Sequence, residues 1–491
     1  MSASGTSVQP PADTTLRPDA VGFLDGLVIG LASTSPAYSL AAVLGPVVAL
    51  VGVHAPGVLL ASFVPMLLIA GAFAALNRVD PDCGTTFSWV TRAMGPGAGW
   101  IGGWAITMTG VLVLGSLAEV GVRFTLLAAG LDAWADSTPV VVVLTAALIL
   151  LMAWICVRGT EVSARLQNGL ILAQTAALGV FAVVAVVRGV RGDSPFGGLT
   201  PAWSWLDPFG AGGAALSSGL LLGVFAYWGW ESAVNLTEET TNPRTAPGRA
   251  AVLSTVVLLL TYLAVATAVV SFAGTEWLAE NADEEEAVFA LLSSETLGGW
   301  DWVVLAAVAT SAIASTQTTI IPASRTGLSM ARRGALPRRF AAVSPTYRTP
   351  DVSTWWVAGI GIAWYVVVGR LSENALYDSI TGLSLLIAFY YALTGVACAV
   401  YFRRQLRTGV RNLLVLGVGP LVGAGLLGWL LVLSVRDLAD PENSYTGQAW
   451  LGAGPPLVIG LGVMAAGIVL MLWWRRRDTA FWRERAGTHG R

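Results

Sequence analysis

One carboxylate draws attention in this sequence, because it lies inside a long apolar stretch among aromatic residues. Glu231 follows the run Phe225-Ala-Tyr-Trp-Gly229-Trp within the stretch 212–239. A charge inside a lipid layer is costly unless it faces a cavity or a partner, so such a residue marks a candidate site. We expect backbone carbonyls at 225–228 to be freed beside the glycine, where they could accept hydrogen bonds from an ammonium group.

Two roles for Glu231 follow from this placement, and the sequence leaves both open. The carboxylate could balance the charge of an ammonium group or carry a proton, while the neighbouring aromatic rings add cation–π contacts. Alternatively, Glu231 could be structural and accept from a backbone N–H of a broken helix, with Trp228 and Trp230 serving only to pack.

A second polar segment interrupts the first apolar stretch of the chain. Ser33, Thr34 and Ser35 precede Pro36. Proline lacks an N–H and clashes with the carbonyl four residues earlier, and adjacent hydroxyls compete for backbone partners, so we expect the helix to break at 31–36. The N–H groups that begin the second half would then suit a carboxylate. A simple proline kink with hydroxyl compensation is the alternative.

The composition of the chain indicates the kind of structure in which these two segments lie. Of 491 residues, 55% are hydrophobic and 12% are charged, whereas about 25% are charged in soluble domains. An apolar stretch of about 20 residues crosses the roughly 30 Å hydrocarbon layer as a helix. Because only helices satisfy their own backbone groups in lipid without closing a barrel, we expect an all-α integral membrane protein. Twelve stretches qualify: 21–52, 57–78, 97–128, 138–157, 162–188, 212–239, 249–273, 301–331, 352–369, 374–402, 412–435 and 451–474.

The two irregular segments fall in the first and the sixth of these spans, which are five apart. Interrupted helices at corresponding positions of two halves are typical of inverted-repeat secondary transporters, whose substrate site lies at the membrane midplane between the breaks. The symmetry is inferred from the breaks and from hydropathy, because no repeat is visible at the level of residue identity.

Arginine placement predicts the orientation. All 28 basic residues are arginine, and all but five fall in the tails and in the connections on one side. Since cytoplasmic loops collect basic residues, we expect a multi-pass plasma membrane protein with cytoplasmic termini, including short tails at 1–20 and 476–491. The exceptions are Arg123, Arg188, Arg191, Arg370 and Arg436.

Several function classes are disfavoured by the same inventory. The net charge of −2 shows no nucleic-acid footprint, and a phosphate-binding loop that ends in Gly-Lys is ruled out without lysine. A membrane enzyme would need a nucleophile with a base, or metal ligands, and the spans contain no histidine. We therefore expect no enzyme, no cofactor and no metal site.

With these residues in hand, the chain resembles the amino acid permeases of the amino acid/polyamine/organocation superfamily over roughly residues 20–405. The resemblance is carried by three segments: Phe225-Ala-Tyr-Trp-Gly229-Trp-Glu231 with Glu238-Glu239-Thr-Thr-Asn242-Pro243; Arg325-Thr-Gly-Leu-Ser-Met-Ala331-Arg-Arg-Gly334; and Gly84-Thr-Thr-Phe87-Ser-Trp89 at the loop that enters span 3.

The resemblance implies a LeuT-like fold and a substrate site. It implies a transporter core at 21–405 built from inverted five-helix repeats at about 21–190 and 212–405, and two accessory helices at 406–475. The family pattern places substrate carboxylate at the span 1 break and the amino group at the span 6 break, with an aromatic gate such as Phe225 or Trp228. The implied positions are Ser33, Thr34, Ser35, Phe225, Ala226, Tyr227, Trp228 and Glu231.

The residues that would couple transport to an ion differ from those of the family that the chain resembles. The resemblance places Gln174 where a proton-coupled subset has lysine, and glutamine cannot cycle a charge. Hydroxyl residues of span 8 could line a sodium site, or could simply bond across helices; these include Ser315, Thr316 and Thr319. A proton is the first candidate for the coupling ion, and sodium is the second.

The sequence therefore favours a secondary transporter of amino acids or closely related amines that works by alternating access, with proton coupling or exchange. The alternatives are a polyamine or organic amine transporter, a sodium-coupled amino acid symporter, and a nutrient sensor that does not transport. Glu238 and Glu239 are expected either to be solvated or to pair with Arg244, Arg249 or the arginines at 332–339.

Overall fold

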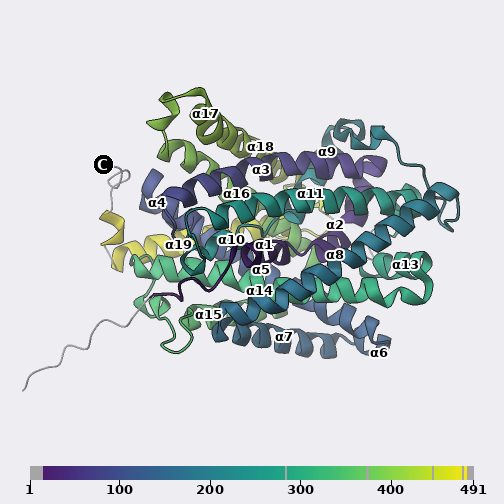
Figure 1. Cartoon of the computed structure of the whole chain (residues 1–491), viewed down its shortest axis with the longest axis horizontal. Coiled ribbons are helices and arrows are strands. Elements are labelled where there is room, and N and C mark those ends of the chain that lie inside the picture. Colours follow the sequence, from purple (N-terminus) through teal and green to yellow (C-terminus); the bar gives the residue numbers. More distant parts are fainter. Residues whose placement is uncertain (1–14, 282–284, 372–374, 445–446, 478–479, 484–491) are drawn as a thin grey trace, which may run out of the picture.

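The structure, a computed structural model, describes residues 15–281, 285–371, 375–444, 447–477 and 480–483. Throughout these residues the regular elements are helices, with two isolated β-bridges and no strand. The long helices run side by side as a bundle, with α13 (Glu285–Leu297) near one end and α4 (Thr86–Met94) near the other (Figure 1). The predicted all-α class is confirmed.

The predicted spans can be traced along the described chain. Ten stretches there are long and apolar enough to cross a membrane; one of them, Phe23–Val79, contains two spans, and Ala215–Ala226 is a shorter apolar helix. The predicted limits agree with the helices to within a few residues. The spans are α1 (Phe23–Thr34) with α2 (Pro36–Val51), α3 (Ala55–Val79), α5 (Pro96–Ala128), α7 (Thr138–Arg158), α8 (Thr160–Arg191), α9 (Gly213–Ala226) with α10 (Ser232–Asn235), α11 (Ala246–Ala273), α14 (Trp302–Arg332), α15 (Asp351–Leu371), α16 (Ala375–Tyr401), α18 (Gly419–Asp437) after a π-helical stretch at Leu413–Val418, and α19 (Pro455–Arg477).

The first and sixth spans are the two that consist of separate half-helices, as predicted. They are held by α3, α8, α11, α14 and α16, and the contact between α5 and α14 is the most extensive in the described part of the bundle. The remaining short helices lie at the bundle ends: α6 (Asp132–Ala135), α12 (Thr275–Glu280) and α17 (Val410–Asn412). The interrupted helices are therefore enclosed by long, continuous ones.

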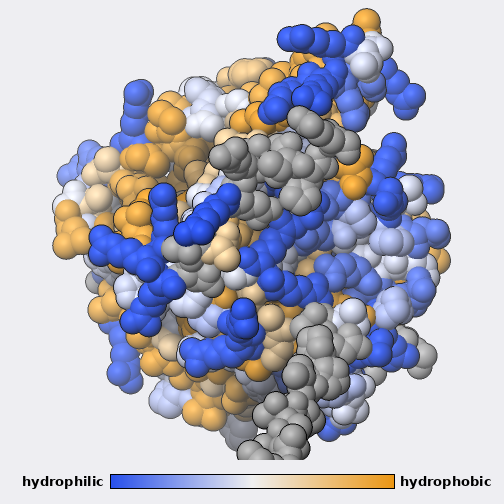
Figure 2. Space-filling model, turned by 90° about the vertical axis from the view of Figure 1, so that its left-hand side faces the viewer, coloured by the Kyte–Doolittle hydropathy of each residue, from blue (hydrophilic) through white to orange (hydrophobic). Residues whose placement is uncertain are grey.

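The two ends of the bundle differ in charge. One end, called the arginine-rich end below, carries Arg332, Arg339, Arg403 and Arg477, and Figure 2 looks onto it; hydrophilic side chains are spread over this face. The opposite end carries α13 and the last turn of α8, with Arg188. The arginine pattern of the sequence thus corresponds to a real separation in space.

The predicted tails fall largely outside the described residues, namely at 1–14, 478–479 and 484–491. Next to them, Val21 pairs with Thr240 in an isolated bridge. Near the other terminus, Phe481 is buried and its ring centroid lies 5.7 Å from that of Phe87. The parts of the tails that the structure describes therefore pack against the bundle.

Candidate substrate site at the helix breaks

The break in the first span is a single residue. α1 ends at Thr34, Ser35 takes left-handed backbone angles (φ 56°, ψ 66°), and Pro36 begins α2. Proline suits the first position of a helix, where an N–H would lack a partner in any case, and it disfavours the right-handed helical conformation in the residue before it. The sequence Ser35-Pro36 therefore ends one helix and starts the next.

Hydroxyl groups satisfy the carbonyls that this break exposes. Ser315 of α14 donates to the Ser33 carbonyl at 2.8 Å, and Ser39 donates to the Thr34 carbonyl at 2.7 Å. The Ser35 hydroxyl lies 2.9 Å from that of Ser311. Ser35 N–H donates to the Leu31 carbonyl, so the backbone donors that lack an acceptor by helix geometry are those at the start of α2.

The break in the sixth span is longer. α9 ends at Ala226, and α10 begins only at Ser232. Gly229 between them has φ +122°, and a Cβ on this residue would lie 2.7 Å from the Ser33 carbonyl. Only glycine tolerates both this backbone angle and this close approach. The backbones of the two breaks therefore touch each other at Ser33 and Gly229.

Glu231 lies in this second break and is 1% exposed. Its carboxylate accepts hydrogen bonds from the hydroxyls of Tyr390 and Tyr391, each at 2.5 Å, and from the Gly229 N–H at 3.2 Å. The Trp228 indole N–H in turn donates to the Tyr390 hydroxyl at 2.5 Å. Burying a carboxylate costs free energy unless donors surround it, and here three donors do so.

Aromatic rings connect the broken helices to one another. Phe225 meets Tyr38 of α2 edge to face, with ring centroids 6.4 Å apart. The ring centroid of Tyr227 lies 4.9 Å from that of Tyr262 in α11, and the Tyr262 hydroxyl donates to the Ala226 carbonyl. The predicted freeing of a carbonyl at 225–228 is therefore seen at Ala226, with a tyrosine as its partner in this state.

The residues predicted for coupling lie in different surroundings. Gln174 of α8 is 1% exposed, and neither of its amide atoms has a hydrogen-bond partner. Ser315 bonds across to the first span, whereas the Thr316 hydroxyl donates to the Ala312 carbonyl of its own helix. The Thr319 hydroxyl is buried without a partner. Ser315 thus shows the predicted bonding across helices, whereas Thr316 bonds within its own helix.

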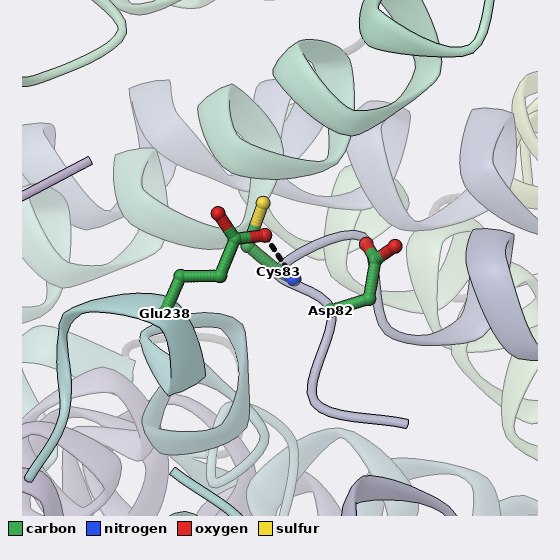
Figure 3. Close-up of side chains that lie close together, drawn as sticks. All are labelled: Asp82, Cys83 and Glu238. Carbon is green, nitrogen blue, oxygen red and sulfur yellow. Dashed lines mark hydrogen bonds between the residues drawn. The ribbon is translucent and has the colours of Figure 1, made fainter. Parts of the chain in front are cut away.

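At the arginine-rich end, a loop between α3 and α4 closes over the sixth span. Glu238 accepts from the Cys83 N–H at 3.1 Å and from Arg332 at 2.8 Å, and Figure 3 shows its carboxyl group next to Cys83. Asp82, in the same loop, accepts from Arg333 at 2.8 Å and from Ser329 at 2.8 Å. These contacts attach the loop to both the sixth and the eighth span.

The possible ligand atoms of Asp82, Cys83 and Glu238 lie within 4.8 Å of one another, but both carboxylates already accept from arginines. Burial would raise the pKa of Asp82, yet Arg333 and hydrogen bonds from Ser88, Gly84 and Ser329 outweigh it and hold that pKa below its usual value. Burial and the two neighbouring carboxylates raise the pKa of the Cys83 thiol well above its usual value. The two carboxylates are therefore hydrogen-bond partners of the arginines, and the thiol stays protonated.

A fully buried ion pair lies beside this loop. Both oxygens of Glu239 accept from Arg325, at 2.7 and 3.1 Å, and the side chains are 0% and 1% exposed. The sequence leaves open whether Glu238 and Glu239 are solvated or pair with arginines, and Glu238 does pair with Arg332, one of the arginines considered. The partner of Glu239 is instead Arg325, which lies about two turns earlier in the same helix. These pairs connect the sixth span to the eighth at the arginine-rich end.

The opposite end of the broken helices is hollow. A cavity of about 270 Å³ lies between the ends of α2 and α9 that are distant from the breaks and the neighbouring ends of α16 and α18. Its lining includes Pro46, Ser217, Leu221 and Asp437. This cavity therefore lies on the side of the breaks that is opposite the arginine pairs.

The sequence does not indicate which residues donate to Glu231 and to the Ala226 carbonyl. Tyr390, Tyr391 and Tyr262 come from α16 and α11, far from the breaks in sequence. The one local signal is the pair of adjacent tyrosines inside an apolar span, since buried hydroxyls need partners.

Known transporters are similar to this chain in sequence and in fold. The methylthioribose transporter of Bacillus subtilis is 25% identical over 74% of this chain and 77% of its own length. The branched-chain amino acid permease of Lactococcus lactis is 24% identical over 70% of this chain and 74% of its own. The crystal structure of MhsT in complex with L-phenylalanine superposes with a TM-score of 0.56 at 14% identity, over 83% of this chain and 98% of that one, which shows the shared fold.

The family is decided by the extent of the match along the chain. A model of the amino acid permease family matches residues 21–472, which include both broken spans, the loop at Cys83 and the last span. The chain therefore belongs to the amino acid permease family.

Proposed function

We propose that this protein carries a small neutral amino acid across the membrane by alternating access, and binds it where the two broken helices meet. The observation that carries the proposal is the contact between Gly229 and Ser33, which brings the N-terminus of α2 and the backbone carbonyls after α9 together inside the bundle. Helix N-termini favour carboxylates, and carbonyl dipoles favour ammonium groups.

The charge of the site supports a zwitterion over a polyamine. The carboxylate of Glu231 is already occupied by three donors, which leaves it little capacity for a second or third ammonium group of a polyamine. A relative named for branched-chain amino acids is consistent with a neutral side chain. Phe225 and Trp228 would border the substrate on its apolar side.

Coupling to protons is the form of the proposal that Glu231 supports. A carboxylate whose donors come from another span can be exchanged between a charged and a neutral form as those spans move. Gln174 cannot take up this role, because an amide does not titrate. A sodium site remains the second alternative, with the hydroxyl of Thr319 as its least committed ligand.

The arginine-rich end is proposed to face the cytoplasm, in the plasma membrane, with both termini on that side. The arginine distribution supports this orientation. With the ion pairs closed at that end and a cavity at the other, the structure would represent the state that is shut toward the cytoplasm.

Uptake into proteoliposomes tests the proposal. The purified chain is assayed with neutral and cationic amino acids, a polyamine and methylthioribose, each with and without proton and sodium gradients. We expect a neutral amino acid to be concentrated when a proton gradient is imposed. Uptake of the polyamine or of methylthioribose alone would contradict the substrate class, and stimulation by sodium alone would contradict the coupling ion.

Glu231→Gln separates the coupling proposal from the substrate proposal. We expect this variant to retain substrate binding but to lose most of the pH dependence of uptake, because an amide keeps the shape of the side chain and cannot carry a proton. Normal uptake with an unchanged pH profile would show that Glu231 has a purely structural role.

A further inference from the structure

A second cavity lies far from the helix breaks, on the side of the bundle at the arginine-rich end. It has a volume of about 440 Å³ and lies between α5, α14, α15 and α19. Its walls are almost entirely apolar and rich in tryptophan, and this size is within the roughly 300–1,000 Å³ of sites that bind small molecules. We call it the tryptophan groove; the residues that matter below are Trp100, Trp104, Trp356, Ile360, Trp473 and Trp474.

The inner wall of the groove is held by hydrogen bonds that leave it apolar. The indole N–H of Trp100 donates to the Ala335 carbonyl at 3.0 Å, and that of Trp474 donates to the Gly334 carbonyl at 3.1 Å. Trp104 donates to the Val463 carbonyl at 2.9 Å and stacks on Trp100 with ring centroids 5.7 Å apart. Because these N–H groups already have acceptors, the groove offers rings rather than donors to a ligand.

The groove opens sideways, toward the lipid layer. Trp356, Ile360 and Trp473 line it and are 44%, 41% and 45% exposed. They belong to α15 and α19, both of which are long and apolar enough to span a membrane. A hollow that is walled by tryptophan and open to hydrocarbon fits a flexible alkyl chain.

Positive charge surrounds the mouth of the groove. Arg339 lines it, and its guanidinium carbon lies 5.5 Å from the ring centroid of Trp356. The guanidinium carbon of Arg477 lies 4.2 Å from the ring centroid of Trp473. Guanidinium groups that stack on rings keep their N–H edges directed outward, where they can bind phosphate in a bidentate manner.

We propose that the tryptophan groove binds one acidic phospholipid, with an acyl chain along the tryptophans and the headgroup phosphate on Arg339 and Arg477. An anionic lipid satisfies both halves of the site. A zwitterionic lipid brings its own cation, which competes with the arginines for the phosphate, and it is therefore expected to bind more weakly. The proposal does not depend on which solute the protein carries.

Native mass spectrometry of the purified full-length chain tests this proposal. Phosphatidylglycerol and phosphatidylcholine with the same acyl chains are titrated separately, and the first is expected to bind about thirtyfold more tightly, the size expected when two basic residues contact an acidic headgroup. Arg339→Gln with Arg477→Gln should remove that preference. Glycerol phosphate without acyl chains should not compete at equal concentration.

Two further variants keep the result interpretable. Arg407→Gln with Arg411→Gln removes the same charge from exposed positions on another part of the arginine-rich end, and should retain the preference. Ile360→Trp fills the groove without a change of charge, and should weaken both lipids several-fold. Equal affinity for the two lipids, or an equal loss in the Arg407/Arg411 control, would overturn the proposal.

Discussion

Glu231 shows how hydrogen-bond donors can hold a buried carboxylate in a membrane protein. Its donors are two tyrosine hydroxyls of α16 and one backbone N–H of its own break. Hydrogen bonds to a charged group contribute about 1.5–3 kcal/mol each. The carboxylate therefore links the sixth span to the tenth, and any movement of one span relative to the other must change the number of its donors.

Tyr391→Phe tests this link at a single residue. The variant removes one donor and leaves the ring, which stacks on Trp230 with centroids 5.2 Å apart. We expect the free energy of unfolding to fall by about 1.5–3 kcal/mol. We also expect the pH profile of uptake to shift, because the charged form of Glu231 loses a hydrogen bond. Thermal unfolding in detergent and uptake at several pH values measure the two effects.

Tyr401→Phe is the matched control for that variant. Tyr401 lies at the end of the same helix, where its ring contacts Phe402. This control should unfold and transport as the wild type does. If Tyr391→Phe behaves in the same way, the hydroxyl of Tyr391 does not support Glu231 in the functioning protein.

At the scale of elements, the two breaks depend on different residues. The first requires Pro36, which ends one helix by excluding its conformation from Ser35. The second requires Gly229, whose backbone angle and lack of a side chain allow contact with Ser33. The first break thus depends on a residue that restricts the backbone conformation, and the second on a residue that permits a conformation that other residues rarely adopt.

Gly229→Ala should separate the two breaks. Alanine at φ +122° is strained, and its Cβ would lie 2.7 Å from the Ser33 carbonyl. We expect a loss of more than about 1 kcal/mol in stability and a near-complete loss of uptake, as measured in proteoliposomes. In contrast, Gly428→Ala, in α18 with open space around it, should be neutral or stabilising by up to about 1 kcal/mol. Uptake by Gly229→Ala at the wild-type rate would show that this contact is dispensable.

The elements could be predicted from the sequence far better than their contacts. Hydropathy predicts the spans, and Pro36 and Gly229 predict the breaks, because these are properties of residues close together in the chain. The partners of Glu231 are about 160 residues away. They depend on how α16 is rotated about its axis, which local patterns do not encode. Arg325 was missed as the partner of Glu239 for the same reason.

At the scale of the whole molecule, the contacts at the arginine-rich end fall into two kinds. Glu238 and Arg332 are 26% and 23% exposed, so their pair contributes little, typically under about 1 kcal/mol. Glu239 and Arg325 are buried, and loss of one partner there leaves an uncompensated charge that costs about 3–5 kcal/mol. The buried pair is therefore the contact that any opening of this end must break or carry along intact.

Glu239→Gln is predicted to loosen this end of the molecule. Cys83 lies next to the pair, buried, and its raised pKa keeps the thiol protonated at pH 8, so alkylation by N-ethylmaleimide should be slow in the wild type. The variant should be alkylated at Cys83 at least about tenfold faster, as followed by peptide mass analysis, because a charge left unpaired favours the opened form.

Glu119→Gln provides the comparison, since it breaks a partly exposed pair with Arg123 at the opposite end. This variant should leave the rate of alkylation at Cys83 as low as in the wild type. Glu239→Asp, which keeps the charge but shortens its reach, should give an intermediate rate and guards against a failure of Glu239→Gln to fold. Equal alkylation rates in all folded variants would mean that the buried pair does not hold this end closed, and that closure depends on the loop at Asp82 and Cys83 instead.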